Sequence, residues 1–151
     1  MKKGARVEKA YEAVRICRRN GLLVHGFFVI GMPWETEETL EQTFEFVKSL
    51  DPDFFDFNIA YPLPGTEFYD IVVRDGLFEA PDPAKGGYAQ AAVRTYALSS
   101  RQLTEWRRRA LLRMYRRPGY IFRTLKHAAS SGNTIHYARA ALYRLQTLLK
   151  G

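Results

Sequence analysis

The feature that most constrains the fold is a short apolar run, Leu22–Met32, which is bounded by Gly21 and Pro33. Its length and its content of Val, Ile and Phe favour a strand buried on both faces, as in parallel sheets covered by helices. Pro33 lacks the amide donor of a strand residue and ends the strand. Thr36 is suited to cap a following helix whose first turn carries two glutamates. The run therefore predicts a strand, a tight turn and a helix.

The chain around this run continues the alternation of helices and strands. Apolar residues at helical spacing predict helices over residues 4–20 and 36–50, and an aromatic stretch predicts a second strand over residues 54–61. A short helix opens at Gly65-Thr66 and ends at Gly76. Such alternation is typical of a parallel sheet. Because two strands cannot cover their own edges or close a barrel, they either continue a sheet supplied by another segment or pair between chains, and we favour the first.

The organisation changes in the second half of the chain. Residues 77–97 are rich in Pro, Gly and Ala and predict a long connection of the kind that often covers a site. Ser99 and Gln102 fit a capping box that opens a helix, and two more helices are expected over residues 119–130 and 135–149. The predicted organisation is thus an α/β part over residues 1–76, a connecting loop over 77–97 and an all-helical basic extension over 98–151.

Charge is divided unevenly between these parts. The chain of 151 residues has a formal net charge of +7, from 23 Lys and Arg against 16 Asp and Glu. Residues 101–151 hold 12 of the basic residues and a single acid, Glu105, which gives +11 and leaves −4 for residues 1–100. A chain divided in this way is expected to have two parts with different surroundings.

Three interpretations of the basic extension stay open. The first is a solvated face of packed helices, whose arginines meet acidic surfaces elsewhere in the protein. The second is a peripheral contact with an anionic membrane through residues 135–149, which mix Leu, Tyr and Arg. The third, nucleic-acid binding, ranks last because no recognition motif supports it. A non-catalytic basic module of this kind is the alternative to an enzymatic function.

Few side chains suggest catalysis or metal binding. Cys17, the single cysteine, excludes an internal disulfide and favours a reducing compartment, so we expect a cytoplasmic protein. It is expected to be a small buried helix residue, and His25 a histidine of the core or its rim. His127 and His136 lack the spacing of metal ligands. No apolar run is long enough to span a bilayer, and no signal peptide begins the chain.

Two segments resemble a known family. Gly26-Phe-Phe-Val-Ile-Gly-Met-Pro-Trp-Glu-Thr36 resembles the fifth-strand segment of radical S-adenosylmethionine (SAM) enzymes, and Tyr61-Pro-Leu-Pro-Gly-Thr-Glu67 is similar to the segment after their sixth strand. The resemblance covers about residues 1–76 and implies the last strands and helices of a partial (β/α)6 barrel. Leu98–Leu103 and Arg107–Tyr120 are similar to the region after the barrel in the cobalamin-binding branch, which includes anaerobic magnesium-protoporphyrin ester cyclase-like and hopanoid-associated enzymes.

The resemblance implies cofactors that this chain cannot hold alone. Radical SAM enzymes bind a 4Fe–4S cluster through three closely spaced cysteines, and thiolates are what stabilise such clusters. With Cys17 as its single cysteine, the chain is expected to be a fragment without SAM cleavage of its own. Its implied partners are a missing N-terminal barrel half, a cobalamin domain and a small-molecule substrate. The implied role is the adenine-side wall of the SAM pocket.

The resemblance also implies a set of cofactor-binding residues and no catalytic residue. The fifth-strand turn packs against the adenine, where Gly31 would allow close approach of the backbone to a flat ring. Glu35 is expected to hold the turn, and Trp34 departs from the Gly that the family often has there. The implied contacts with SAM are Ile30, Gly31, Met32, Pro33, Glu35, Tyr61, Pro62 and Leu63.

Overall fold

The computed structural model describes residues 6–79 and 90–130. The elements in chain order are α1 (Val7–Arg19), β1 (His25–Ile30), α2 (Glu37–Leu50), β2 (Phe54–Ile59), α3 (Glu67–Arg74), α4 (Ser100–Tyr115) and α5 (Pro118–Ser130). The predicted α/β class is confirmed, and each helix and strand expected within the described residues is present. The helix expected over 135–149, His136 and residues 80–89 of the connection lie outside the described residues.

The chain divides into two compact units, residues 1–107 and 108–151, and α4 begins in the first and ends in the second. The predicted domains 1–76, 77–97 and 98–151 stay a prediction. No helix of the described residues is long and apolar enough to cross a membrane.

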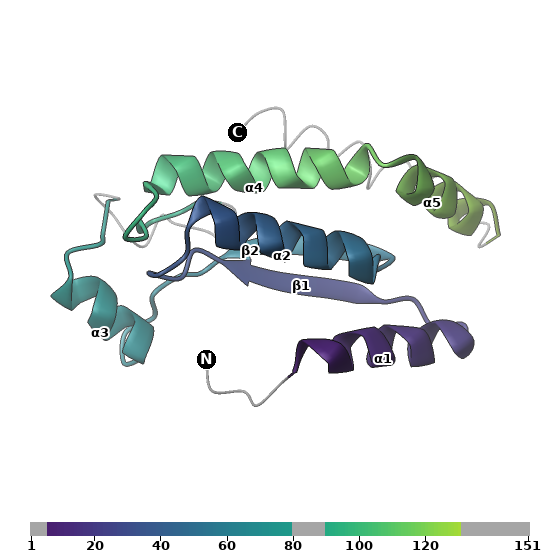
Figure 1. The fold of residues 1–151 in the computed structure, drawn as a ribbon, viewed down its shortest axis with the longest axis horizontal. Coiled ribbons are helices and arrows are strands. Elements are labelled where there is room, and N and C mark those ends of the chain that lie inside the picture. The colour runs from purple at the N-terminus through teal and green to yellow at the C-terminus, as the bar shows by residue number, and fades with distance from the viewer. Residues whose placement is uncertain (1–5, 80–89, 131–151) are drawn as a thin grey trace. The chain divides into compact units, whose positions relative to one another are not determined.

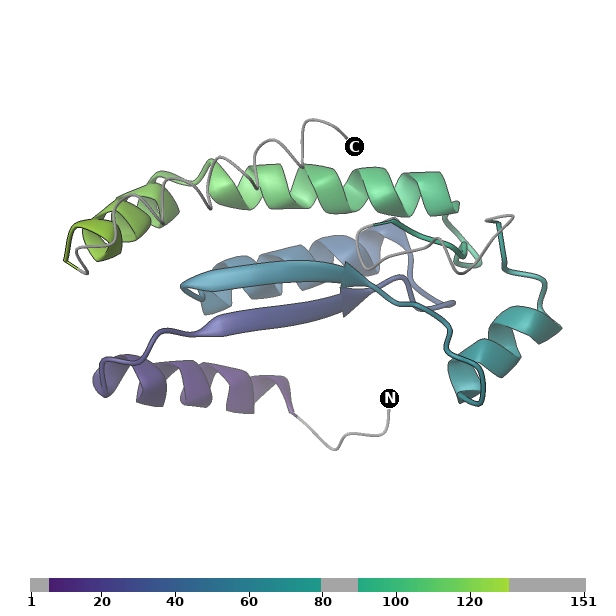
Figure 2. The same cartoon turned by 180° about the vertical axis from the view of Figure 1, so that it is seen from behind.

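The first unit is built on two parallel strands joined by a helix. β1 and β2 pair in parallel, with His25 opposite Phe54 and Ile30 opposite Ile59. α2 runs from the end of β1 back toward the start of β2, and the two strands lie side by side in both ribbon views (Figures 1 and 2). The pairing continues past the strands, because the Ala60 amide donates to the Ile30 carbonyl at 2.7 Å. The two chain segments after the strands therefore leave the sheet at the same edge.

Local chemistry explains where α2 begins and ends. The Thr36 hydroxyl accepts from the Thr39 amide at 3.3 Å, and the Thr39 hydroxyl accepts from the Thr36 amide at 3.0 Å. This capping box satisfies amides that a helix start leaves without partners. Asp51 ends the helix in the left-handed region, with φ of 51°. The predicted cap at Thr36 is confirmed.

One face of the sheet is covered and forms the core of the first unit. Phe55 and Phe57 of β2 are fully buried, and the apolar residues of α2 that face them are buried as well. The first turns of α4 complete the cover: Trp106 packs edge-on against Phe57, with ring centroids 5.7 Å apart. The Arg107 guanidinium donates to the Phe57 carbonyl. Burial of these aromatic side chains stabilises the covered face of the sheet.

The opposite face of the sheet is exposed among the described residues. Successive strand side chains point to opposite faces, and the helices cover one of them, so Phe27 is 64% and Val29 43% exposed. In the rear view the strands lie in front of α2 (Figure 2). The expectation that this strand is buried on both faces is therefore wrong for the chain by itself. The apolar residues on both faces of the strand, which led to that expectation, are nevertheless present.

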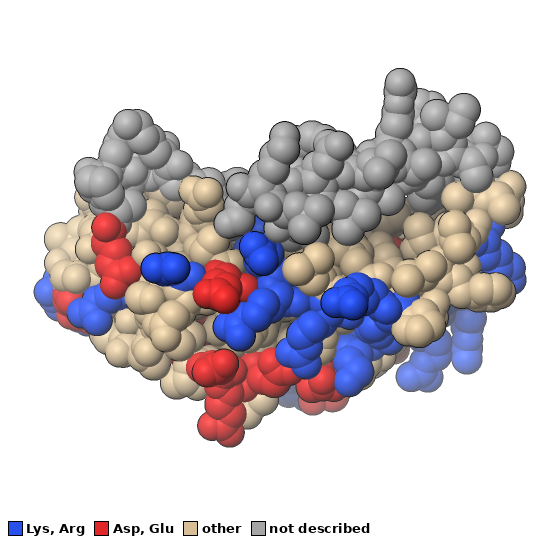
Figure 3. All heavy atoms as spheres, turned by 90° about the horizontal axis from the view of Figure 1, so that it is seen from above, with Lys and Arg blue, Asp and Glu red and all other residues tan. Residues whose placement is uncertain are grey.

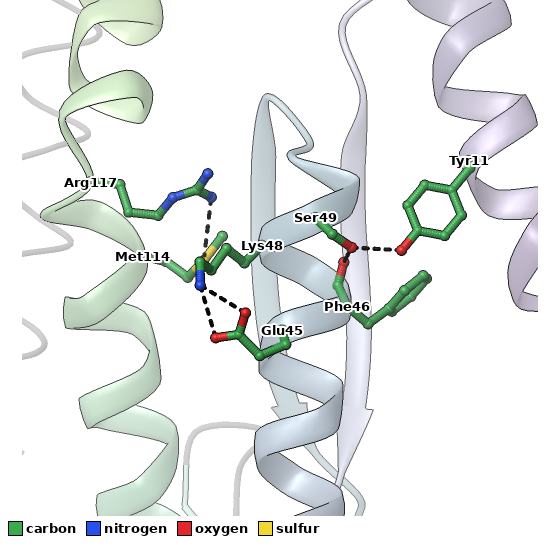
Figure 4. Close-up of polar contacts among 7 residues, drawn as sticks. All are labelled: Tyr11, Glu45, Phe46, Lys48, Ser49, Met114 and Arg117. Carbon is green, nitrogen blue, oxygen red and sulfur yellow. Dashed lines mark hydrogen bonds and ion pairs between the residues drawn. The ribbon is translucent and has the colours of Figure 1, made fainter.

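α1 is also only partly covered. Its apolar positions recur at helical spacing as predicted, but Val14 alone among its residues is buried, and Val7 is 57% exposed. The helix is held to α2 by Tyr11, whose hydroxyl lies 2.6 Å from Ser49 Oγ and whose ring meets Phe46 edge-on (Figure 4). A neighbouring ion pair on α2 joins Lys48 to Glu45 at 2.7 Å.

The described part of the long connection folds back onto the turn that follows β1. Phe78 and Val93 form an antiparallel bridge, and Val93 joins a small apolar cluster with residues of α3. Thr95 is buried, and its hydroxyl accepts from the Leu98 amide at 2.8 Å. The next amide, of Tyr96, donates to the Pro33 carbonyl at 2.7 Å. The connection therefore supports the turn after β1.

The predicted capping box at the start of α4 is confirmed. The Gln102 side-chain oxygen accepts from the Ser99 amide at 2.9 Å, and the Gln102 amide donates to Ser99 Oγ at 3.2 Å. In the second unit, α5 begins at Pro118, a position where the missing proline amide costs no helical hydrogen bond.

Candidate functional site at the ends of the strands

A hollow of about 780 Å³ lies where the two strands end. It is lined by the first strand's exposed face (Phe27 and Val29), by the turn after it (Met32 and Trp34), by the segment after β2 and by the start of α3. Most of this lining is apolar, and Trp34 is 59% exposed at the rim. Ligand sites in parallel α/β folds are built at the carboxyl ends of strands, as here.

The turn after β1 depends on Gly31. Its φ of +88° lies in the left-handed region that side chains disfavour. A Cβ atom at Gly31 would also lie 3.1 Å from Cγ2 of Ile59 and 3.6 Å from the amide nitrogen of Ala60. The close approach that this glycine allows is therefore to the neighbouring strand. The family resemblance implies close approach to a bound ring, but the fold already demands a glycine here.

Glu35 holds the same turn from within. One of its carboxylate oxygens accepts from the Met32 amide at 2.9 Å and from the Gly31 amide. Burial raises the pKa of Glu35 above its ordinary value, and the hydrogen bonds from these two amides oppose that shift. The role expected for Glu35, fixing the turn, agrees with these contacts.

Replacing Glu35 by alanine is expected to lower the free energy of unfolding by about 1–2 kcal/mol, because the amides of buried Gly31 and half-buried Met32 lose a charged acceptor. Glu35→Gln keeps an acceptor oxygen and is expected to lose less. Urea denaturation at neutral pH measures both. Glu38→Ala, at an exposed position in the first turn of α2, is the matched control. Equal effects of Glu35→Ala and Glu38→Ala would mean that the turn does not depend on the Glu35 carboxylate.

The residues predicted to contact SAM fall into two groups. Met32, Tyr61 and Leu63 line the hollow directly. The others are not among the lining residues and support the turns instead; they are Ile30, Gly31, Pro33, Glu35 and Pro62, all buried except Glu35, which is half-buried. Contact of any of them with SAM stays a prediction.

Several lining residues escaped the sequence reasoning. Phe27 and Val29 belong to a run that reads as buried on both faces, so nothing in their types sets them apart. The sequence feature that could have identified them is their alternation along the strand, which puts Phe27 and Val29 on the face opposite Phe28 and Ile30. Asn58 lies on that same face in β2, opposite Val29 in the pairing register.

A histidine and a carboxylate meet at the other end of the exposed face. His25 Nε2 lies 2.8 Å from Asp56 Oδ2, and the His25 ring stacks on Phe27 with centroids 4.2 Å apart. His25 is an exposed strand residue, and Cys17 is half-buried on α1. Over residues 6–79 and 90–130, no group of three or more His, Cys, Asp or Glu side chains could hold a metal ion.

Three relatives illustrate what the chain is similar to. It is 30% identical over 123 residues to an uncharacterised methyltransferase of Pyrococcus horikoshii, covering 82% of this chain and 27% of that protein. It is 28% identical over 116 residues to the anaerobic magnesium-protoporphyrin IX monomethyl ester cyclase of Cereibacter sphaeroides, covering 77% of this chain and 18% of that enzyme. The chain is related to the radical SAM enzymes.

A third relative is the cytidylyl-2-hydroxyethylphosphonate methyltransferase of Streptomyces wedmorensis, 27% identical over 85 residues, which are 52% of this chain and 16% of that enzyme. No family model matches the chain. The chain spans about a quarter or less of the length of these relatives.

The residues present fit one cofactor of radical SAM enzymes and not the other. A 4Fe–4S cluster needs several thiolates, and Cys17 is the one cysteine of the sequence, so this chain does not fit the cluster. The hollow suits contact with the flat aromatic face of a base such as the adenine of SAM, because its lining includes the apolar side chains of Met32, Trp34 and Leu63.

Proposed function

We propose that the chain supplies the adenine-side wall of the SAM pocket in a radical SAM enzyme, as the last strands of a partial (β/α)6 barrel. The observation that carries the proposal is the shared hollow, onto which the segments after two adjacent parallel strands both open. The earlier strands and the cluster cysteines would come from other parts of the same protein. The chain alone is then expected to be inactive.

The exposed face of the sheet supports this proposal. Phe27 and Val29 place large apolar surface in water, and an uncovered apolar sheet invites pairing or further packing. In a barrel, helices cover the outside and the alternate strand residues fill the inside. The covered face with Phe57 would then be the outer one, and the face with Phe27 the inner one. The relatives are several times longer than the chain, which leaves room for the missing strands.

Each part of the hollow has a role in this proposal. Met32, Trp34 and Leu63 would pack against the adenine, while Glu35 and Gly31 fix the turn that presents them. When bound, SAM and the cluster supply the radical chemistry, and the protein orients them. The similarity of Leu98–Leu103 and Arg107–Tyr120 to the cobalamin-binding branch extends the proposal to a cobalamin domain and a small-molecule substrate elsewhere in the enzyme.

Sequencing and expressing the longest reading frame that contains this chain tests the proposal. We expect this frame to encode an upstream Cys-x-x-x-Cys-x-x-Cys motif. The protein translated from the whole frame, called the long product below, is expected to form 5′-deoxyadenosine from SAM after anaerobic reconstitution. The 151-residue chain is expected not to form it. In the long product, Leu63→Ser is expected to raise the KM for SAM about tenfold, or about 1.4 kcal/mol, with a smaller effect on kcat.

Val73→Ser is the matched control, because Val73 is 54% exposed, like Leu63 at 56%, but lies outside the hollow. An upstream region without the cysteine motif, or equal KM values for the two variants, would contradict the proposal. The first outcome would favour the alternative of a non-catalytic basic module.

A further inference from the structure

α5 carries an apolar stripe that points away from its own unit. Five residues recur at helical spacing along one side of the helix, and all five are exposed. The largest are Phe122, 72% exposed, Leu125, 62% exposed, and Ile121, 45% exposed. The complete stripe is Pro118, Ile121, Phe122, Leu125 and Ala129.

The part of the α5 surface that packs borders the stripe on one side. Tyr120 and Ala128 are buried, and the Tyr120 ring lies 5.6 Å from the ring of Tyr115, centroid to centroid. The Arg123 guanidinium lies over the Tyr120 ring at 5.9 Å. A helix of a globular protein ordinarily turns its apolar stripe inward, so an outward stripe of this size indicates a binding surface.

Positive charge lies beside the stripe and in the residues that precede it. Residues 108–130 contain no Asp or Glu. Lys126 is exposed at the edge of the stripe, and four exposed arginines lie in the preceding residues: Arg108, Arg109, Arg113 and Arg116. Lys and Arg side chains gather along α4 and α5 in the view from above (Figure 3).

We propose that α5 binds the surface of an anionic lipid bilayer, lying in the plane of the interface with Phe122, Leu125 and Ile121 among the acyl chains. The combination of an apolar stripe with flanking basic residues is what such helices use: the stripe gains burial, and the cations meet lipid phosphates and carboxylates. The helix contacts the membrane without spanning it. This surface differs from residues 135–149, for which the sequence pattern suggests a membrane contact.

The charges favour a membrane over the other occupants of such a face. A second copy of the chain would bring two surfaces of the same positive sign together, which opposes association. A nucleic acid would attract the cations but would leave aliphatic Leu125 and Ile121 in water, because phosphate contacts dominate that kind of binding. An anionic bilayer accepts both the apolar stripe and the charges.

Co-sedimentation of the full 151-residue chain with vesicles tests the proposal. We expect binding to vesicles of equal parts phosphatidylserine and phosphatidylcholine, weaker binding at high salt, and at least about tenfold weaker binding to phosphatidylcholine alone. The double variant Phe122→Ser/Leu125→Ser is expected to weaken binding to the anionic vesicles at least about tenfold, because it removes two large apolar side chains from the interface. Lys126→Glu is expected to weaken it about fivefold or more.

The control is Leu22→Ser/Val73→Ser, which removes two side chains of similar exposure, 59% and 54%, from the first unit and is expected to bind like the unchanged chain. Circular dichroism checks that each variant keeps its helices. Three results would each overturn the proposal: no vesicle binding, equal loss of binding in both double variants, or loss of self-association in the α5 variant without any change in vesicle binding. None of them bears on the SAM-pocket proposal, which rests on the hollow in the first unit.

Discussion

Replacing Phe57 by alanine is expected to lower the free energy of unfolding of the first unit by about 3–5 kcal/mol. Phe57 is fully buried at the centre of the covered face, where its ring packs between Phe28, Phe55 and Trp106. Truncation removes these contacts and leaves a cavity that β2, held in register with β1, cannot close. Urea denaturation followed by tryptophan fluorescence, to which both Trp34 and Trp106 contribute, measures the loss.

Phe27→Ala is the matched control, because it makes the same change in the adjacent strand on the opposite face. Phe27 is 64% exposed, so the cost in this chain is expected to stay within about 1 kcal/mol. Similar costs at the two positions would show that the second face is covered in solution. In the longer protein that we propose, the interior of the barrel would bury Phe27, and the cost of Phe27→Ala should rise toward that of Phe57→Ala.

Gly31→Ala is expected to cost about 2–5 kcal/mol, as the sum of two effects. A side chain at positive φ costs about 1–2 kcal/mol, and crowding against a packed neighbour adds about 1–3 kcal/mol. The first follows from the φ of +88°, and the second from the 3.1 Å separation between the new Cβ and Ile59 Cγ2. Thermal or urea unfolding measures the total.

Gly65→Ala separates the two effects. Gly65 also has a positive φ, +82°, but a Cβ there would meet no atom within 4 Å. Its cost is therefore expected to be about 1–2 kcal/mol, the conformational part alone. If Gly31→Ala costs no more than Gly65→Ala, then the approach of the turn to Ile59 is looser than the structure describes. In the long product, Gly31→Ala should also impair SAM binding, because Met32 and Trp34 follow Gly31 directly.

Features that depend on a few neighbouring residues could be predicted from the sequence. Thr36 caps α2, Ser99 and Gln102 open α4, and Pro33 follows the end of β1, because each of these effects acts over three or four residues. The role of Glu35 in the turn belongs to the same class, since its partners are three and four residues away. The relation to radical SAM enzymes likewise rests on two short segments.

Features that depend on what packs against an element could not be predicted. Phe27 and Phe57 are the same residue type in adjacent strands, yet one is exposed and the other buried, because helices cover a single face. The contact of Tyr96 with Pro33 joins residues 63 positions apart, which no local pattern encodes.

The sequence by itself thus determined the elements, their caps and the family relation, since these follow from local backbone preferences and side-chain spacing. Tertiary structure alone decided which side of the sheet is covered, why Gly31 is required, and that α5 turns Phe122 outward. Burial is a property of the neighbours that surround a residue, and those neighbours come from distant parts of the chain.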